Sequence, residues 1–205
     1  MKVAAAATPA LDSPTRTRIL SSAQKRFAAF GYRRTGVAEL ARDVGIAAAT
    51  LYRYFDDKED IFRAVIADLY ARWLARGREV LAGGGTAVER ITRLGQASVA
   101  FNAENPLIAS VYQRDHEIVF APLLEELHRT LLEGNVAMIA DVLRDGIREG
   151  SVRPIDPDAA ALVLYISGGS LSQQPFRSYE QIMPVFQSII FDGLTPRGGR
   201  KERRR

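Results

Sequence analysis

The sequence predicts an all-α protein. Apolar residues recur at three- and four-residue steps along nearly the whole chain of 205 residues, and no run alternates apolar and polar residues over six or more positions. The composition, 47% apolar and 25% charged, is that of a folded globular protein, and the length allows one large domain or two small ones. The longest apolar runs are far shorter than a membrane span, and the apolar residues after Lys2 are too few for a signal peptide.

Residue types that the sequence lacks narrow its chemistry. The absence of cysteine excludes disulfides, thiolate zinc sites and cysteine nucleophiles, and we expect a cytoplasmic protein. Of the two histidines, His116 stands between Asp115 and Glu117. Adjacent side chains on a helix point in different directions and cannot share one metal or proton relay. No nucleophile-elbow, dinucleotide-binding or metalloprotease motif is present, so we expect no enzyme and no bound cofactor or metal.

The first predicted helix begins close to residue 13. Either Ser13 or Thr15 is suited to cap it, with Pro14 just inside. Gly31 is expected to end it, because glycine tolerates the positive φ of a helix C-terminus. Four apolar residues follow at four- and three-residue steps: Ile19, Ala23, Phe27 and Phe30.

Two short helices follow. We expect Thr35 to cap the second helix, although Glu39 then lies one position too late for a strict capping box. Gly45 breaks that helix, and the third begins near Ala47 or Ala48. Two short helices joined by a tight turn that contains glycine are the outline of a helix-turn-helix. Its third helix buries Leu51 and Phe55 and leaves a small or hydrogen-bonding outer face that fits a major groove: Ala48, Ala49, Tyr52 and Arg53.

Charge is distributed unevenly along the chain. Residues 1–60 hold 10 Lys or Arg against 7 Asp or Glu, residues 61–195 hold 12 against 16, and the last ten hold 6 against 1. The stretch from Ser13 to Arg34 contains six basic residues and no acidic one. A one-signed segment of this length favours a surface for phosphates over a merely soluble basic face.

The rest of the chain is also expected to be helical. Asp56 and Asp57 cap a long fourth helix, and Gly83–Gly85 break the pattern before a fifth helix that stops at Asn105-Pro106. A short helix from Leu107 to about Arg114 precedes three more, which begin near Pro122, Asp156 and Tyr179. The last two are apolar on more than one face, which exceeds the need of one core, and we predict that they form a dimer interface.

The segment from Arg18 to Trp73 resembles the TetR (tetracycline repressor) family of transcriptional regulators. Its core reads GYRRTGVAELARDVGIAAATLYRYFDDKEDIF. The elements that carry the resemblance are Phe30-Gly31-Tyr32, Thr35, Leu40-Ala41, Gly45, the run Thr50-Leu51-Tyr52-Arg53-Tyr54-Phe55, and Lys58-Glu59. They cover about a quarter of the chain.

The resemblance implies roles in DNA binding. Thr35, Thr50 and Tyr52 match positions that bond backbone phosphates, and Lys58 adds a charge at another phosphate. Arg53 and Tyr54 match positions that reach base edges or further phosphates. Both tyrosines have the alternative of being core residues. Arg16, Arg33 and Arg34 would strengthen the positive surface. Where the family often has Ser, a small residue and Gly, this chain has Ala47, Ala48 and Ala49, which leaves methyl–thymine contacts, Arg53 or DNA shape for readout.

The resemblance also implies a small-molecule pocket in the C-terminal helices. Each candidate for its wall has the alternative of being plain core or surface. The aromatic candidates are Trp73, Phe101, Tyr112, Phe120 and Tyr165, and the polar ones are Gln113, Arg114 and His116.

These observations lead to a definite domain plan. We expect an N-terminal arm (1–12), a helix-turn-helix DNA-binding domain (13–60), a ligand-binding and dimerisation domain (61–195) and a basic tail (196–205). The predicted function is a repressor that binds a palindromic operator in double-stranded DNA as a homodimer and is released by a small-molecule effector. The alternative is an architectural protein that binds DNA without sequence preference, to which the basic tail would contribute salt-sensitive affinity.

Overall fold

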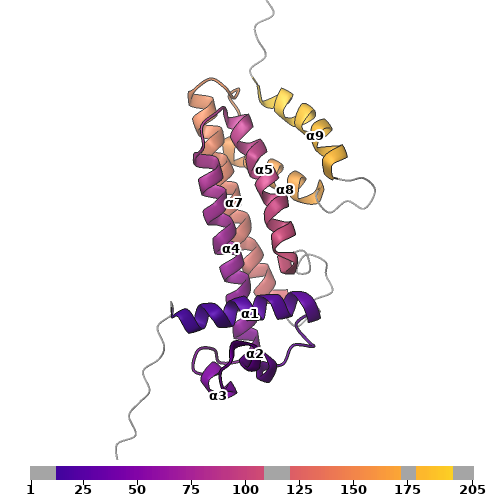
Figure 1. The fold of residues 1–205 in the computed structure, drawn as a ribbon. Helices are drawn as coiled ribbons and strands as arrows, with labels where there is room; N and C mark the ends of the chain where they lie inside the picture. The colour runs from indigo at the N-terminus through magenta and orange to yellow at the C-terminus, as the bar shows by residue number, and fades with distance from the viewer. Residues whose placement is uncertain (1–12, 109–120, 172–178, 196–205) are drawn as a thin grey trace, which may run out of the picture. The chain divides into compact units, whose positions relative to one another are not determined.

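The computed structural model describes residues 13–108, 121–171 and 179–195, and over these residues it is helical with no β-strand, as predicted (Figure 1). The chain divides into two compact units, unit 1 (Met1–Ala71 and Glu104–Leu127) and unit 2 (Arg72–Ala103 and His128–Arg205). The predicted arm 1–12 and tail 196–205 lie outside the described residues. The helices are α1 (Pro14–Phe30), α2 (Val37–Val44), α3 (Ala48–Leu51), α4 (Lys58–Ala82), α5 (Ala87–Glu104), α7 (Ala121–Arg148), α8 (Pro157–Leu171) and α9 (Tyr179–Leu194).

Among the described helices, none combines the length and the apolar character that crossing a bilayer requires.

Helix α1 begins and ends where the sequence predicts. The Ser13 hydroxyl accepts a hydrogen bond from the Arg16 amide at 3.2 Å, and Pro14 occupies the first helical position. At the other end, Gly31 has a φ of 75°, and its amide donates to the Phe27 carbonyl at 2.9 Å. The positive φ explains why glycine stands there.

The cap of α2 differs from the prediction by one residue. Gly36, not Thr35, is the N-cap, and its amide donates to the Glu39 carboxylate at 3.1 Å. Glu39 is therefore the third helical residue, the position from which a carboxylate reaches back to the cap. Thr35 cannot cap the helix because its side chain is turned inward, where its hydroxyl donates to the Gly31 carbonyl at 2.9 Å.

Apolar side chains from α1 to α4 close the core of unit 1. Phe27 and Phe62 meet edge to face with ring centroids 5.2 Å apart. Helix α4 starts at the predicted aspartates, where the Asp57 carboxylate accepts from the Asp60 amide at 2.7 Å. Residues of this core with less than 2% of their surface exposed include Ile19, Phe27, Leu40, Leu51, Ile61 and Phe62.

Unit 2 contains the remainder of α4 together with most of α5 and α7, and it packs tightly at two glycines. A Cβ at Gly77 of α4 would lie 3.1 Å from the Met138 side chain, and one at Gly134 of α7 would lie 3.0 Å from Leu74. Helices α4 and α7 thus approach more closely than larger residues would permit. One buried polar pair joins them, because Trp73 Nε1 donates to Asn135 Oδ1 at 2.9 Å.

Within a single chain, helices α8 and α9 bury only part of their apolar side chains. Asp156 caps α8, its carboxylate accepting from the amides of Asp158 and Ala159. Both helices bury some apolar residues, such as Leu164 and Phe191. Among the side chains that the structure describes, these helices also expose large apolar ones: Leu162, Val163, Ile166, Val185 and Ile189.

Candidate nucleic-acid interface

A three-residue turn joins α2 to α3. Gly45 adopts the left-handed conformation (φ 72°, ψ 37°), and its amide donates to the Arg42 carbonyl at 3.1 Å. The Ile46 amide donates to the Ala41 carbonyl at 3.0 Å. These bonds satisfy the last carbonyls of α2 and set the direction in which α3 leaves, which gives the geometry of a helix-turn-helix.

Helix α3 divides its residues between core and solvent. Leu51 is fully buried and Phe55 is 3% exposed, whereas Tyr52 is 52% exposed and Arg53 also faces solvent. The core packing of Leu51 therefore fixes an outward face that carries a phenol and a guanidinium. The other predicted contact residues divide similarly: Ala47 and Ala49 are exposed, and Ala48, Thr50 and Tyr54 are half-buried.

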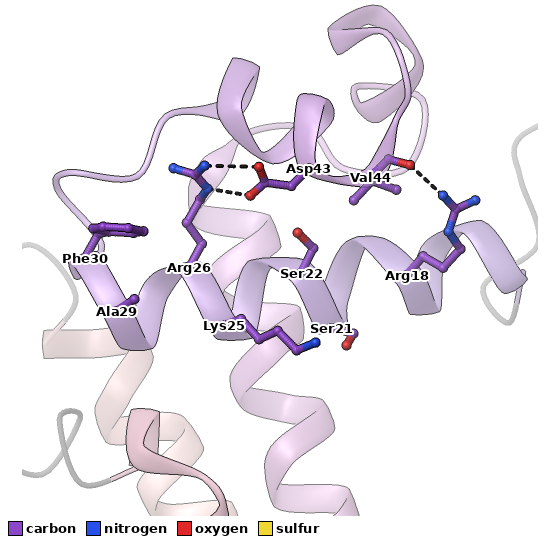
Figure 2. Close-up of a pocket in the computed structure, with 9 residues that line it drawn as sticks. All are labelled: Arg18, Ser21, Ser22, Lys25, Arg26, Ala29, Phe30, Asp43 and Val44. Carbon is purple, nitrogen blue, oxygen red and sulfur yellow. Dashed lines mark hydrogen bonds and ion pairs between the residues drawn. The ribbon is translucent and has the colours of Figure 1, made fainter.

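The basic side chains of α1 do not form one free positive surface. A groove of about 560 Å³ runs along α1 beside the end of α2 (Figure 2). In it, Arg26 forms an ion pair with Asp43 at 2.6 Å and with Glu39 at 3.0 Å. Hydrogen bonds from Arg26 hold the pKa of the Asp43 carboxyl below its ordinary value. Arg18 donates to the Val44 carbonyl at 2.6 Å, so both arginines join α1 to α2.

The three arginines predicted to strengthen the positive surface have different surroundings. Arg16 is half-buried, with its guanidinium 5.3 Å from the centre of the Phe55 ring, next to the end of α3. Arg34 is exposed, and its Nε donates to the Phe30 carbonyl at 2.9 Å. Arg33 is exposed beside it. All three lie in unit 1 with the predicted contact residues of α3.

Thr35 and Lys58 both turn toward the protein. Thr35 is 1% exposed, and its hydroxyl donates to the Gly31 carbonyl. In this conformation the hydroxyl is therefore not available to a phosphate. Lys58 is half-buried, and its Nζ donates to the Tyr32 carbonyl at 3.1 Å. Sequence reasoning did not single out Tyr32 as a functional residue, although it belongs to the Phe30-Gly31-Tyr32 motif.

The predicted effector residues that the structure describes belong to the core of unit 2 or its edge. Trp73 and Phe101 are 8% and 5% exposed, with ring centroids 5.4 Å apart, and Tyr165 of α8 is half-buried. Sequence reasoning missed Asn135, the polar partner of Trp73; an asparagine amid the apolar stripe of α7 was the available signal. Tyr112, Gln113, Arg114, His116 and Phe120 lie outside the described residues.

Comparison with known proteins identifies the family. Residues 19–65, which contain the helix-turn-helix, match the family model of the bacterial regulatory proteins of the tetR family. The chain is 30% identical over 144 residues to the HTH-type transcriptional regulator UidR of Escherichia coli strain K12. The aligned residues cover 69% of this chain and 70% of UidR. The chain belongs to the TetR family.

Similarity to TetR-family proteins extends over nearly the whole chain. The HTH-type transcriptional repressor KstR2 of Mycolicibacterium smegmatis is 26% identical over 205 residues, covering 95% of this chain and 97% of KstR2. The crystal structure of the regulator FadR of Bacillus subtilis, in complex with stearoyl-CoA, has the same fold. It covers 87% of this chain and 98% of FadR, with a TM-score of 0.69 and 20% identity.

The family membership decides between the functional classes considered above. The chain is a DNA-binding transcriptional regulator and not an enzyme. An architectural protein without sequence preference is not favoured, because the relatives are named transcriptional regulators or repressors and α3 presents side chains suited to reading a groove.

Proposed function

We propose that this TetR-family regulator is a repressor that binds a palindromic operator as a homodimer and is released by a small molecule. The observation that carries the DNA-binding part is the outward face of α3, where Tyr52 and Arg53 stand in solvent while Leu51 anchors the helix in the core. Because its partner is DNA, the protein acts in the bacterial cytoplasm.

The proposed DNA contacts separate into positioning and reading. Thr50 and Tyr52 donate hydroxyl hydrogen bonds to phosphates on either side of the major groove. Arg53 reads a base edge, for which guanine offers the best paired acceptors, and Tyr54 adds a base or phosphate contact. The three alanines at the start of α3 supply methyl contacts to thymine. Arg16, Arg33 and Arg34 add charge to the surrounding surface.

Helices α8 and α9 are the proposed dimer interface. Val163 and Ile166 on α8 are 55% and 53% exposed, and Val185 and Ile189 on α9 are 59% and 69% exposed. Apolar side chains of this size, gathered on consecutive helices, indicate a surface that a second copy covers. A two-fold axis there would bring α8 and α9 of both copies into a four-helix bundle.

Unit 2 is the proposed sensor of a lipophilic effector. Its aromatic core around Trp73 and Phe101 favours apolar ligands. FadR in the crystal structure of the relative holds stearoyl-CoA, so acyl-CoA thioesters are the first probes to try. Helix α4 contributes residues 58–71 to unit 1 and 72–82 to unit 2. An effector acts through it only to the extent that it binds the released state more tightly than the DNA-bound state.

Selection of duplexes from a random pool at about 0.15 M salt tests the proposal, because phosphate contacts alone weaken as salt rises. We expect a two-fold-related consensus. Acyl-CoA probes should then dissociate the protein from the selected duplex. If no consensus is recovered and binding disappears when residues 196–205 are deleted, the result would favour an architectural protein that binds DNA without sequence preference.

Tyr52→Phe tests the docking of α3 on the selected duplex. The substitution removes one hydroxyl from an exposed site and leaves the core intact. We expect operator affinity to fall about 100-fold, because each of the two half-sites loses one charge-assisted hydrogen bond to a phosphate. The dimer should persist in light scattering. Parental affinity in this variant would show that α3 docks differently.

A further inference from the structure

Lys58 stands at the start of α4 with its ammonium directed at one residue. Its Nζ lies 3.1 Å from the Tyr32 carbonyl oxygen and 4.1 Å from the centre of the Tyr32 ring. The carbonyl accepts a charge-assisted hydrogen bond, and the ring face attracts the cation. Both contacts draw the first turn of α4 against the segment that leads from α1 into α2.

Tyr32 is the fixed point of that segment. Its ring stacks on Phe27 at 5.8 Å and meets Phe62 of α4 edge to face at 5.3 Å. Its carbonyl also accepts from the Thr35 amide at 3.3 Å, and Thr35 in turn holds Gly31 through its hydroxyl. The N-cap Gly36 follows directly, so the position of Tyr32 determines where the first amides of α2 point.

The surroundings of Lys58 are poorly suited to a phosphate. The segment Asp56–Asp60 carries four carboxylates and one ammonium. Burial raises the pKa of the Tyr32 hydroxyl, and the carboxylates of Glu59 and Asp57 lie near enough to raise it further. A phosphate that approached Lys58 would meet these negative charges as well.

We propose that Lys58 is a positioning residue for DNA binding, which acts by holding the Tyr32 carbonyl and thereby aiming the first amides of α2 at the operator backbone, and not chiefly as a phosphate ligand. This deepens the proposed function, on which it rests. Movement of α4 would then change the aim of α2 through the Lys58–Tyr32 contact.

The salt dependence of operator binding separates the two roles. On B-DNA each phosphate contact adds about 0.9 to the slope of log affinity against log salt concentration. Lys58→Met is compared with Lys25→Met, which removes the same charge from an exposed position on α1. We expect Lys58→Met to bind about tenfold more weakly than Lys25→Met at every salt concentration, with the same slope. A slope lower by about 1.8 for the dimer, with affinities that converge at high salt, would overturn the proposal.

A double-mutant cycle tests whether Lys58 acts through Tyr32. If it does, Lys58→Met costs less further affinity in a Tyr32→Leu background, because Tyr32→Leu has already removed the ring that contacts the ammonium and holds the carbonyl in place. Full additivity of the two substitutions would contradict the proposal. If thermal unfolding shows that the Met variant does not fold, Lys58→Gln takes its place in both assays; because its amide can still donate to the Tyr32 carbonyl, the loss of affinity should be smaller than for Met, again with an unchanged salt slope.

Hydrogen exchange in the DNA-free protein gives a readout independent of the operator. Lys58→Met should speed exchange of the Thr35 amide and of the first amides of α2, and should leave the Gly45 amide at the far end of α2 unchanged. Unchanged exchange at Thr35 would overturn the proposal even where DNA binding is weakened. If the parental protein selects no consensus DNA, the proposed function fails, and this measurement still decides the contact between Lys58 and Tyr32.

Discussion

Helices α1 to α3 bury their large apolar side chains, whereas α8 and α9 leave several of theirs in solvent. In the first region Ile19, Leu40 and Leu51 are fully buried within one chain. In the second, Val163 and Ile189 are 55% and 69% exposed. The difference is the one that the proposed dimer predicts: the helix-turn-helix region closes its core within one chain, while the exposed apolar side chains of α8 and α9 are left for a second copy to cover.

The two regions also differ in how polar groups are used. In unit 1, Arg18 and Arg26 join α1 to α2 at the rim of the groove in Figure 2. In unit 2, the Trp73–Asn135 hydrogen bond lies inside the core. Polar pairs at the rim join the two helices and remain accessible to salt and pH. A buried pair is shielded from both.

The largest loss of stability and of operator binding is expected from a substitution in the core of unit 1. Phe27→Ala removes a 1% exposed ring that contacts Tyr32 and Phe62. Loss of a buried phenylalanine costs about 3–5 kcal/mol, so unit 1 should unfold at a much lower temperature and operator binding should be lost. Calorimetry and circular dichroism measure this. A loss below about 1 kcal/mol would show that the core of unit 1 is not closed as described.

A charge on α9 should separate the copies. Ile189→Asp places a carboxylate on the 69% exposed position of α9. We expect monomers in light scattering and roughly 100-fold weaker operator binding, because the two half-sites are no longer bound together. The matched control is Val99→Asp, a 38% exposed apolar residue on α5. A dimer that survives Ile189→Asp but not Val99→Asp would move the interface away from α8 and α9.

The smallest effect is expected at the rim of unit 1. Hydrogen bonds from Arg26 lower the pKa of Asp43 in the folded protein. A lowered folded-state pKa means that the stabilisation is complete above the ordinary carboxyl pKa of about 3.9 and is lost as pH falls through the lower folded value. Asp43→Asn should therefore lower Tm slightly at pH 7, and the difference from the parent should vanish in strong acid. The control is Glu133→Gln, in an exposed pair on α7. If the difference in Tm between Asp43→Asn and the parent grows on acidification, the pKa of Asp43 is not lowered in the folded protein.

Sequence patterns predicted the parts of the fold that depend on local chemistry. The cap at Ser13 and the stops at Gly31 and Gly45 follow from residues whose preferences are strong and whose neighbours are close in sequence. The position of Glu39 was a sequence signal for a cap at Gly36, but the stronger capping preference of Thr35 outweighed it, and only tertiary packing, which buries Thr35, removes that residue as the cap.

The candidate site divides in the same way. The outward direction of Tyr52 followed from the buried spacing of Leu51 and Phe55. The internal partners of Arg26 and Lys58 did not, because each is separated from its partner by more than ten residues and only the fold brings them together. Charge counted along α1 thus overstated the positive surface available to DNA.

The chain contains a single tryptophan, and it is Trp73, hydrogen-bonded and 8% exposed in unit 2. Light at 295 nm excites tryptophan and largely spares the seven tyrosines. Emission from the native protein therefore reports on one known position, next to Phe101 in unit 2. An effector titration can be followed by that emission without any label, while the DNA is followed separately through a dye on the duplex.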